Sequence, residues 1–310
     1  MLRIRSAVAL VAAACAAGGI AFATPALAAT AAQTSCATAV FETDGYHNGE
    51  SLANYAGFNG HVPAGYEAHP IPYQDGIFPG VDAKTLDDAV SGGKSALDGA
   101  VRAFHAQCPG SHMVITGYSE GALVAGDELD TLSQSGGIPH DLVKGVLYGD
   151  PRRAFGDGGV GGVAGGIETN IPTILPGVTM RGPRGFGDLA VHEICNENDG
   201  ICNSTNMITN ALAFANGLDG YASGDHGYSI EPVRDIGSGL TLNLQPSRIG
   251  YGPPLPVQIG TPWQIQQQLG DTPGALAAVR TAMATVNSLL PAPVKQALQS
   301  MPWYRLPAEA

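Results

Sequence analysis

The residues Thr116-Gly117-Tyr118-Ser119-Glu120-Gly121-Ala122 fit the pattern Gly-x-Ser-x-Gly. They follow a short apolar run, 113–115, and precede a helix-like run, 122–129. A serine on a sharp turn between a strand and a helix projects its hydroxyl into a cleft, and the flanking glycines leave room where a Cβ would collide. Ser119 is therefore a candidate nucleophile, and an ordinary turn serine is the alternative.

A serine hydroxyl is a weak nucleophile at neutral pH, so it needs an adjacent base and an acid that orients that base. On this type of turn the chain order is serine, acid, histidine. His226 is the only histidine after residue 199, and it is the candidate base. Asp199 is the candidate acid, with Glu197 and Asp150 as competitors. The chemistry that these residues predict is acyl transfer through a covalent serine intermediate.

Stabilising the oxyanion of such a reaction requires backbone N–H donors. One donor is expected from Glu120, the residue after the nucleophile. The other is expected from the loop that follows the first strand, Glu42-Thr43-Asp44-Gly45. Thr43 is the candidate there, and its hydroxyl is a possible third donor.

Five short apolar or extended runs alternate with helical patterns, which predicts an α/β fold with a central parallel sheet flanked by helices, in three layers. The longest predicted helix begins at Thr85, where Asp88 three residues later completes a variant of the capping box. The expected strands are residues 37–41, 113–115, 142–148 and 189–194, with an extended run at 70–73; the expected helices are residues 85–105, 122–129, 206–215 and 275–290.

The N-terminal segment has the features of a secretory signal. Arg3 and Arg5 precede an apolar run, and Ala26-Leu27-Ala28 is a typical cleavage site. We therefore expect a signal peptide over 1–28, a catalytic domain over 29–231 and a C-terminal extension over 232–310 that packs on it. The expected location is extracellular or in the cell envelope, without stable membrane insertion.

The formal net charge is −12 at pH 7, which disfavours nucleic acid as a partner. The expected partner is a lipid or ester substrate, and the sequence does not indicate an oligomeric state. Neither a cofactor nor a metal is expected. Four cysteines lie beyond the signal, and an even number in an exported chain predicts two disulfides. Three pairings are possible among Cys36, Cys108, Cys195 and Cys202.

With these residues in place, the chain resembles the cutinase-like serine α/β-hydrolases, and in particular the PE-PPE-domain hydrolases of actinobacteria. The resemblance covers roughly residues 35–230. It rests on Cys108-Pro109 followed by a strand and the Ser119 turn, on the eight-residue run 195–202 that brackets Asp199, and on His226 with Tyr228. It implies the bridges Cys36–Cys108 and Cys195–Cys202. Residues 73–97 and 149–153 are more similar to the PE-PPE pattern.

Two departures concern the oxyanion site. Cutinases usually carry Arg-Gly-Ser or Arg-Gly-Thr after the first strand, where this chain has Glu42-Thr43-Asp44-Gly45. They carry Gln after the nucleophile, where this chain has Glu120. An anionic side chain that pointed into the oxyanion site would lower activity.

The predicted function is hydrolysis of carboxylic esters of the lipid, acyl or polyester class, as in cutinases, esterases and lipases. An acyltransferase that passes the acyl group to a sugar or lipid is the first alternative. A non-catalytic envelope-binding protein on a hydrolase scaffold is the second.

Overall fold

The computed structural model describes residues 36–155, 164–254, 263–264 and 292. The expected signal peptide and the helix predicted over 275–290 lie outside these residues. Six strands in this part of the chain form one sheet in the order β2-β1-β3-β4-β5-β6, and every pair is parallel. The strands are β1 (Thr38–Thr43), β2 (Tyr66–Pro70), β3 (Met113–Tyr118), β4 (Val143–Tyr148), β5 (Ala190–Asn196) and β6 (Gly239–Asn243).

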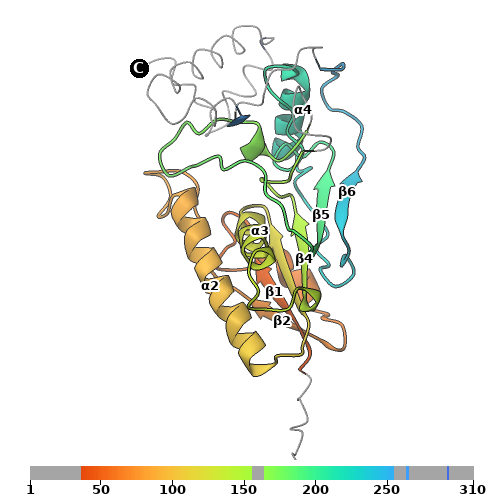
Figure 1. Ribbon diagram of the computed structural model, residues 1–310. Coiled ribbons are helices and arrows are strands. Elements are labelled where there is room, and N and C mark those ends of the chain that lie inside the picture. The colour runs from red at the N-terminus through yellow and green to blue at the C-terminus, as the bar shows by residue number, and fades with distance from the viewer. Residues whose placement is uncertain (1–35, 156–163, 255–262, 265–291, 293–310) are drawn as a thin grey trace, which may run out of the picture. The chain divides into compact units, whose positions relative to one another are not determined.

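Two helices, α2 (Leu86–Gln107) and α3 (Glu120–Ser133), cover one face of the sheet (Figure 1). Because side chains alternate along a strand, Phe41 and Ile115 point into this layer, where they pack with Leu97 and Leu129. The side chain of Thr85 accepts a hydrogen bond from the backbone N–H of Asp88, which confirms the predicted start of α2.

The opposite face of the sheet carries the other set of alternating side chains, including Val40 and Val114. Tyr55 and Phe58 pack on them from the short helices η1 (Ala53–Tyr55) and α1 (Ala56–Asn59). Ile230 adds a contact from the segment that leads to β6. The predicted α/β fold with a parallel sheet flanked by helices is confirmed, although the helices on this face are only single turns.

A further helix, α4 (Ala211–Ala222), lies beyond the carboxyl ends of the strands (Figure 1). It begins later than the sequence predicted, because the side chain of Asn210 caps its first turn by accepting from Ala213 N–H. The remaining described elements are the single turns η2 (His140–Leu142) and η3 (Ile167–Thr169). None of the described helices is long and apolar enough to cross a membrane.

The sequence did not predict β6, which lies beyond residue 231. It pairs with β5 from His192↔Gly239 to Asn196↔Asn243, so the sheet extends into the segment expected as a C-terminal extension. The disulfide Cys36–Cys108 joins the residues before β1 to the end of α2, and Cys195–Cys202 closes the loop after β5. Both pairings implied by the family resemblance are therefore present. Disulfides persist in oxidising compartments, which supports an extracytoplasmic location.

Candidate active site

The strand order reverses between β1 and β3, and in open α/β sheets ligands bind outside the carboxyl ends of the strands at such a point. Ser119 follows β3 directly, and Gly45 follows β1. A Cβ added to Gly45 would lie 3.0 Å from Cβ of Ser119. The backbone after β1 thus passes against the candidate nucleophile.

The turn at Ser119 is strained. Its backbone has φ 56° and ψ −119°, a conformation that residues other than glycine rarely adopt. Gly117 and Gly121 make this turn possible, because a Cβ on Gly117 would lie 2.2 Å from the Gly121 carbonyl oxygen. A Cβ on Gly121 would lie equally close, at 2.2 Å, to the carbonyl oxygen of Thr43. The two glycines allow the Ser119 turn to pack closely against β1.

Asp199 and His226 meet through a direct hydrogen bond. Nδ1 of His226 is 2.7 Å from Oδ2 of Asp199, and Asp199 is fully buried. Nε2 of His226 is also buried and has no hydrogen-bond partner among the described residues. The histidine ring stacks 5.1 Å from the ring of Tyr118, the residue before Ser119. The pair therefore lies at the Ser119 turn with one imidazole nitrogen unoccupied.

The loop that carries Asp199 is held from several sides. The Cys195–Cys202 disulfide closes it, and Ile201 N–H donates to Oδ1 of Asp199 at 2.9 Å. Helix α4 packs directly on it, since a Cβ on Gly220 would lie 1.9 Å from the carbonyl oxygen of Asn198. The candidate acid is thus fixed in place without contact with water.

Two residues that the sequence analysis gave no role connect the acid loop to the base loop. The amide of Asn196 donates to the carbonyls on either side of His226, those of Asp225 and Gly227, at 2.7 and 3.1 Å. The hydroxyl of Tyr228 donates to Oδ2 of Asp199 at 2.5 Å. Only the short spacing of Tyr228 from His226 hinted at its role, and nothing in the sequence identified Asn196.

The two competing acids have other partners. Asp150 forms a buried ion pair with Arg184 at 2.8 Å, and Glu197 accepts from the backbone N–H of Gln245 at 2.8 Å. The other histidine near the sheet edge, His192, contacts Asp235 O and Thr241 Oγ1. The structure thus brings Asp199, rather than its competitors, to His226.

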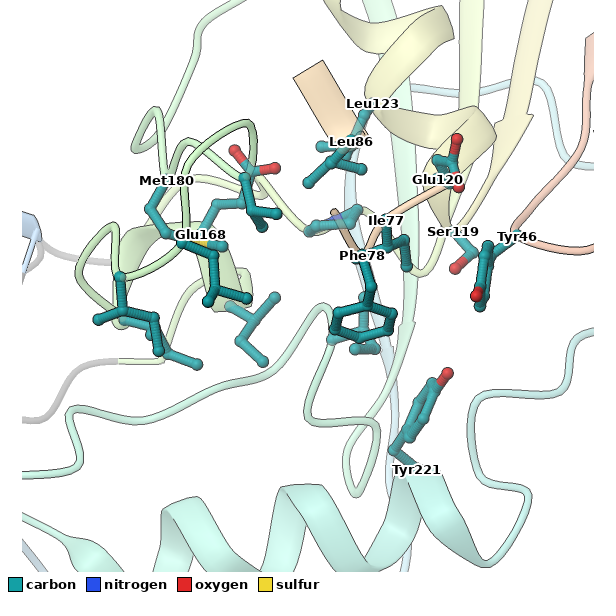
Figure 2. A pocket seen from close by; sticks show the side chains of 17 residues that line it. Tyr46, Ile77, Phe78, Leu86, Ser119, Glu120, Leu123, Glu168, Met180 and Tyr221 are labelled. Carbon is teal, nitrogen blue, oxygen red and sulfur yellow. The ribbon is translucent and has the colours of Figure 1, made fainter. Parts of the chain in front are cut away.

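The hydroxyl of Thr43 does not serve as the additional donor that the sequence suggested. It is buried and lies 2.8 Å from the carbonyl oxygen of Gly121 and 3.1 Å from that of Thr116. A hydroxyl has one proton, and here that proton is used in a hydrogen bond between β1 and the Ser119 turn. Tyr46 lines the pocket beside Ser119, as Figure 2 shows.

Glu120 begins α3, and its carboxyl is buried. Its Oε1 accepts from Gly76 N–H at 3.2 Å. Burial raises the pKa of Glu120 to about 8, and the negative charges of Asp75 and Asp82 contribute. The side chain is therefore mostly neutral at pH 7, which removes the repulsion that an anionic residue would cause beside a developing oxyanion.

An apolar cavity of about 180 Å³ opens beside Ser119 (Figure 2). Its walls come from the residues before and at the start of α2, from α3, and from the connection between β4 and β5. No group of three or more His, Cys, Asp or Glu side chains that could hold a metal occurs in the part of the chain that the structure describes.

Comparison with known proteins identifies the family. The family model described as Cutinase matches residues 24–222, so the chain belongs to the cutinase family, a family of serine ester hydrolases. Over 133 residues the chain is 36% identical to the "Carboxylesterase Culp6 homolog" of Corynebacterium glutamicum. That match covers 38% of this chain and 43% of the relative, which is less than half the relative's length.

Solved structures are similar at lower identity. A cutinase-like protein from Cryptococcus sp. is 16% identical, with a TM-score of 0.39 over 64% of this chain and 99% of that chain. Lysin B from Mycobacteriophage D29 is also 16% identical, with a TM-score of 0.39 over 81% of this chain and 88% of that chain.

Proposed function

We propose that this chain is an exported serine esterase that hydrolyses carboxylic esters of lipid or other acyl substrates. Ser119 attacks the acyl carbonyl, His226 accepts the serine proton and returns it to the leaving alcohol, and Asp199 orients His226. Water then attacks the acyl-enzyme by the same route in reverse and releases the acid. Family membership supports the reaction class, and the likeness to the PE-PPE-domain hydrolases remains part of the proposal.

One observation carries the assignment. The buried hydrogen bond from His226 Nδ1 to Asp199 fixes the imidazole tautomer, so that Nε2 is the nitrogen left to act as a base. The ring that carries this nitrogen lies 5.1 Å from the ring of Tyr118, the residue before Ser119. His192, by contrast, uses both of its ring nitrogens for hydrogen bonds, to Asp235 O and Thr241 Oγ1.

We assign the stabilisation of the oxyanion to two backbone N–H donors. The first is Glu120 N–H, which belongs to the first turn of α3, where N–H groups lack partners within the helix. The second comes from the loop after β1. Thr43 was the expected residue, but it lies within β1 opposite Gly117. The loop approaches Ser119 at Gly45, whose N–H already donates to Asp44 Oδ1, so we assign the second donor to the next residue, Tyr46, which lines the pocket with Ser119.

Kinetics of Ser119→Ala test the proposal. With p-nitrophenyl butanoate, kcat of the variant should fall by about a thousandfold or more, because triad members act as a unit. Arg234→Ala, which changes an exposed side chain paired with Asp235, serves as a control and should keep wild-type turnover. Ester turnover near the wild-type rate in Ser119→Ala would contradict the proposal.

Hydrolysis and acyl transfer share the acyl-enzyme and differ in the molecule that attacks it. Products formed from a p-nitrophenyl ester in the presence of a sugar or glycerol acceptor separate the two. Free acid as the main product supports the esterase, and an acylated acceptor as the main product supports the transferase. A folded protein that is inert in both assays would favour the non-catalytic alternative.

A further inference from the structure

The turn that follows β4, residues 149–153, has no part in the reaction proposed above. Strand β4 pairs with β3 on one side and with β5 on the other, and both pairings are parallel. The turn therefore lies at the carboxyl edge of the sheet, between the Ser119 turn and the acid loop, which carries Asp199 and is closed by the Cys195–Cys202 disulfide. From this position it contacts every segment that bears a triad residue.

Gly149 lies against the candidate base. Its backbone has φ 62°, a value that favours glycine. A Cβ added to it would lie 2.7 Å from Cε1 and 3.1 Å from Nδ1 of His226. The backbone N–H of Gly149 donates to the carbonyl oxygen of Ile194 at 3.0 Å, which fixes the turn to β5. The imidazole ring thus packs directly on the backbone of this turn.

Asp150 connects the turn to α3. Its Oδ1 accepts from Nη2 of Arg184 at 2.8 Å, and the same nitrogen donates at 2.7 Å to the carbonyl oxygen of Ala122, in the first turn of α3. Nη1 of Arg184 pairs with Asp127, also of α3, at 2.7 Å. Arg184 belongs to residues 164–189, several of which line the cavity beside the nucleophile, and we call these residues the wall segment.

Arg153 reaches the acid loop from the other end of the turn, and it is only 4% exposed. Its Nε donates to the carbonyl oxygen of Cys202 at 2.6 Å, and its Nη2 donates to Oδ1 of Asn203 at 3.1 Å. Because a guanidinium is planar, its N–H groups hold two acceptors at fixed angles, which a flexible ammonium group does not. Arg153 thus fixes the end of the acid loop to the turn after β4.

Asn203 carries this contact to the triad acid. Its Nδ2 donates to the carbonyl oxygen of Glu197 at 2.7 Å, and its backbone N–H donates to the carbonyl oxygen of Asp199 at 2.8 Å. A guanidinium can only donate, so Arg153 requires Oδ1 of Asn203 to face it, which leaves Nδ2 for Glu197. The orientation of one amide side chain therefore links Arg153 to the backbone around Asp199.

The charge of Arg153 also acts on the acid and base. Burial lowers the pKa of Arg153, whereas Glu193, Asp150, Tyr228 and Asp199 act in the opposite direction. A Coulomb interaction is mutual, so the cation disfavours a positive charge on the imidazole that is bonded to Asp199. Loss of the guanidinium should therefore change both the geometry and the electrostatics of the pair.

We infer that Arg153 is a positioning residue for the reaction, and that its two hydrogen bonds set the orientation of Asp199 against His226. Gly149 receives the imidazole ring, so the turn after β4 holds the acid and the base in one frame. The inference rests on the proposed function, because the orientation of this pair matters to turnover only if Ser119 is the nucleophile.

Arg152, the neighbouring residue, has a different role. Its guanidinium donates to Asp127 at 2.7 Å and to the carbonyl oxygen of Gly182 at 2.8 Å. These bonds join the turn to α3 and to the wall segment, not to the acid loop. The two adjacent arginines therefore allow a role in the triad to be separated from the support of the surrounding fold.

The test compares two replacements of Arg153 by their kcat and KM for p-nitrophenyl butanoate from pH 4 to pH 9. Arg153→Lys keeps the charge and loses the planar pair of donors, so kcat should fall about tenfold while KM stays nearly unchanged. The acid limb of the kcat/KM profile, where turnover rises as the imidazole loses its proton, should not move.

Arg153→Met also removes the charge. Its kcat should fall at least as far, and its acid limb should move to higher pH, because the imidazolium is no longer opposed by a nearby cation. A role in folding alone would change the amount of folded protein and would leave the acid limb in place.

Asn203→Ala keeps the inference testable if Arg153→Met does not fold. Asn203 is only half-buried, and its replacement removes the amide between Arg153 and Glu197 while the cation stays. The kcat of Asn203→Ala should fall about fivefold to tenfold, because the acid loop loses part of its support. Its acid limb should match that of the wild type.

Arg152→Met is the matched control, since it removes an adjacent, largely buried arginine whose hydrogen bonds go to α3 and the wall segment. Its acid limb should stay at the wild-type position. A folded Arg153→Met with the kcat and acid limb of the wild type, an equal shift of the acid limb in Arg152→Met, or an Asn203→Ala variant with wild-type kcat would overturn the inference. Loss of ester turnover in Ser119→Ala establishes the esterase separately, so a failure of this role and a failure of the proposed function give different results.

Discussion

The hydroxyl of Tyr228 donates to Oδ2 of Asp199, the same oxygen that lies 2.7 Å from Nδ1 of His226. The tyrosine also accepts a hydrogen bond from Asn196 N–H at 3.1 Å. Burial and the neighbouring Asp199 charge raise the pKa of Tyr228, so it remains a donor. Tyr228 thus competes with the imidazole for one carboxylate oxygen and fixes the orientation of the acid.

Tyr228→Phe should lower kcat about tenfold and leave KM nearly unchanged, because the acid loses a positioning contact. With one donor gone, Asp199 should interact more strongly with the charged imidazolium. The acid limb of the kcat/KM profile should therefore move to higher pH, which a purely structural role would not cause. The measurement is ester turnover from pH 4 to pH 9.

Tyr148→Phe is the control for this change. Tyr148 is a buried neighbour whose ring lies 6.0 Å from that of Tyr228, but its hydroxyl donates to Asp235 instead. The two variants should cost a similar free energy of unfolding, about 1–3 kcal/mol each. An acid limb that is identical in the wild type and in Tyr228→Phe would show that the Tyr228 hydroxyl does not influence the acid.

The raised pKa of Glu120 predicts how kcat/KM changes at alkaline pH. Its pKa of about 8 means that its carboxyl becomes charged as the pH rises through 8, on the residue whose backbone N–H is assigned to the oxyanion. The wild type should lose kcat/KM above that pH, whereas Glu120→Gln should keep it. The pH dependence of ester turnover between pH 7 and pH 10 tests this.

Glu128→Gln provides the comparison for Glu120→Gln. Glu128 is a buried carboxyl on the same helix whose pKa is raised to about 7, but it pairs with Lys94 and does not line the pocket. Its replacement should leave the alkaline limb unchanged. If Glu120→Gln follows the wild-type decline, ionisation of Glu120 is not its cause.

Sequence patterns predicted the parts of the structure that depend on local signals. Four strands, β1, β3, β4 and β5, were predicted within a few residues, since runs such as β3 and β4 are apolar and bounded by turns. The extended run expected at 70–73 shares only Pro70 with β2. By contrast, β6 has mostly exposed residues and owes its conformation to pairing with β5. Asp199 and His226 were chosen as candidates by chain order, and the fold places a hydrogen bond between them.

What the sequence could not predict depends on contacts between distant residues. The wall segment has no regular periodicity, and the arginines that hold it lie far from Asp127 in the sequence. The Asn196 and Tyr228 contacts exist only because β5 brings the two loops together. The Thr43 hydroxyl was misassigned because sequence alone does not show whether a side chain points into the active site or toward the backbone of the Ser119 turn.

The two disulfides should have separable effects. Replacing Cys36 and Cys108 by Ser opens a loop with a sequence separation of 72 and should cost about 4 kcal/mol of unfolding free energy by chain entropy. Below the unfolding temperature, kcat should stay near the wild-type value, because this bridge lies away from the site. Thermal denaturation and kcat at a low temperature measure the two effects.

Replacing Cys195 and Cys202 should give the opposite balance. The sequence separation is 7, so the entropic cost is about 2.5 kcal/mol. However, kcat should fall tenfold or more, because the bridge holds the loop that carries Asp199. Loss of kcat in the Cys36/Cys108 variant but not in this one would contradict the assigned role of the loop.

Adjacent glycines in α2 should respond oppositely to alanine. A Cβ on Gly92 meets no atom within 4 Å, so Gly92→Ala should stabilise the protein by about 0.5–1 kcal/mol. A Cβ on Gly93 would lie 2.9 Å from Val124 and 3.0 Å from Tyr73, so Gly93→Ala should destabilise it by about 1–3 kcal/mol. Denaturant unfolding measures both, and equal effects would contradict the packing of α2 on α3.

The most direct test of the catalytic assignment is labelling with a fluorophosphonate, followed by mass spectrometry of the digested protein. The account predicts one covalent adduct, on Ser119, whose formation slows at least a hundredfold in His226→Ala. An intact, folded chain with both disulfides formed and no adduct on Ser119, or an adduct that forms equally fast without His226, would contradict it.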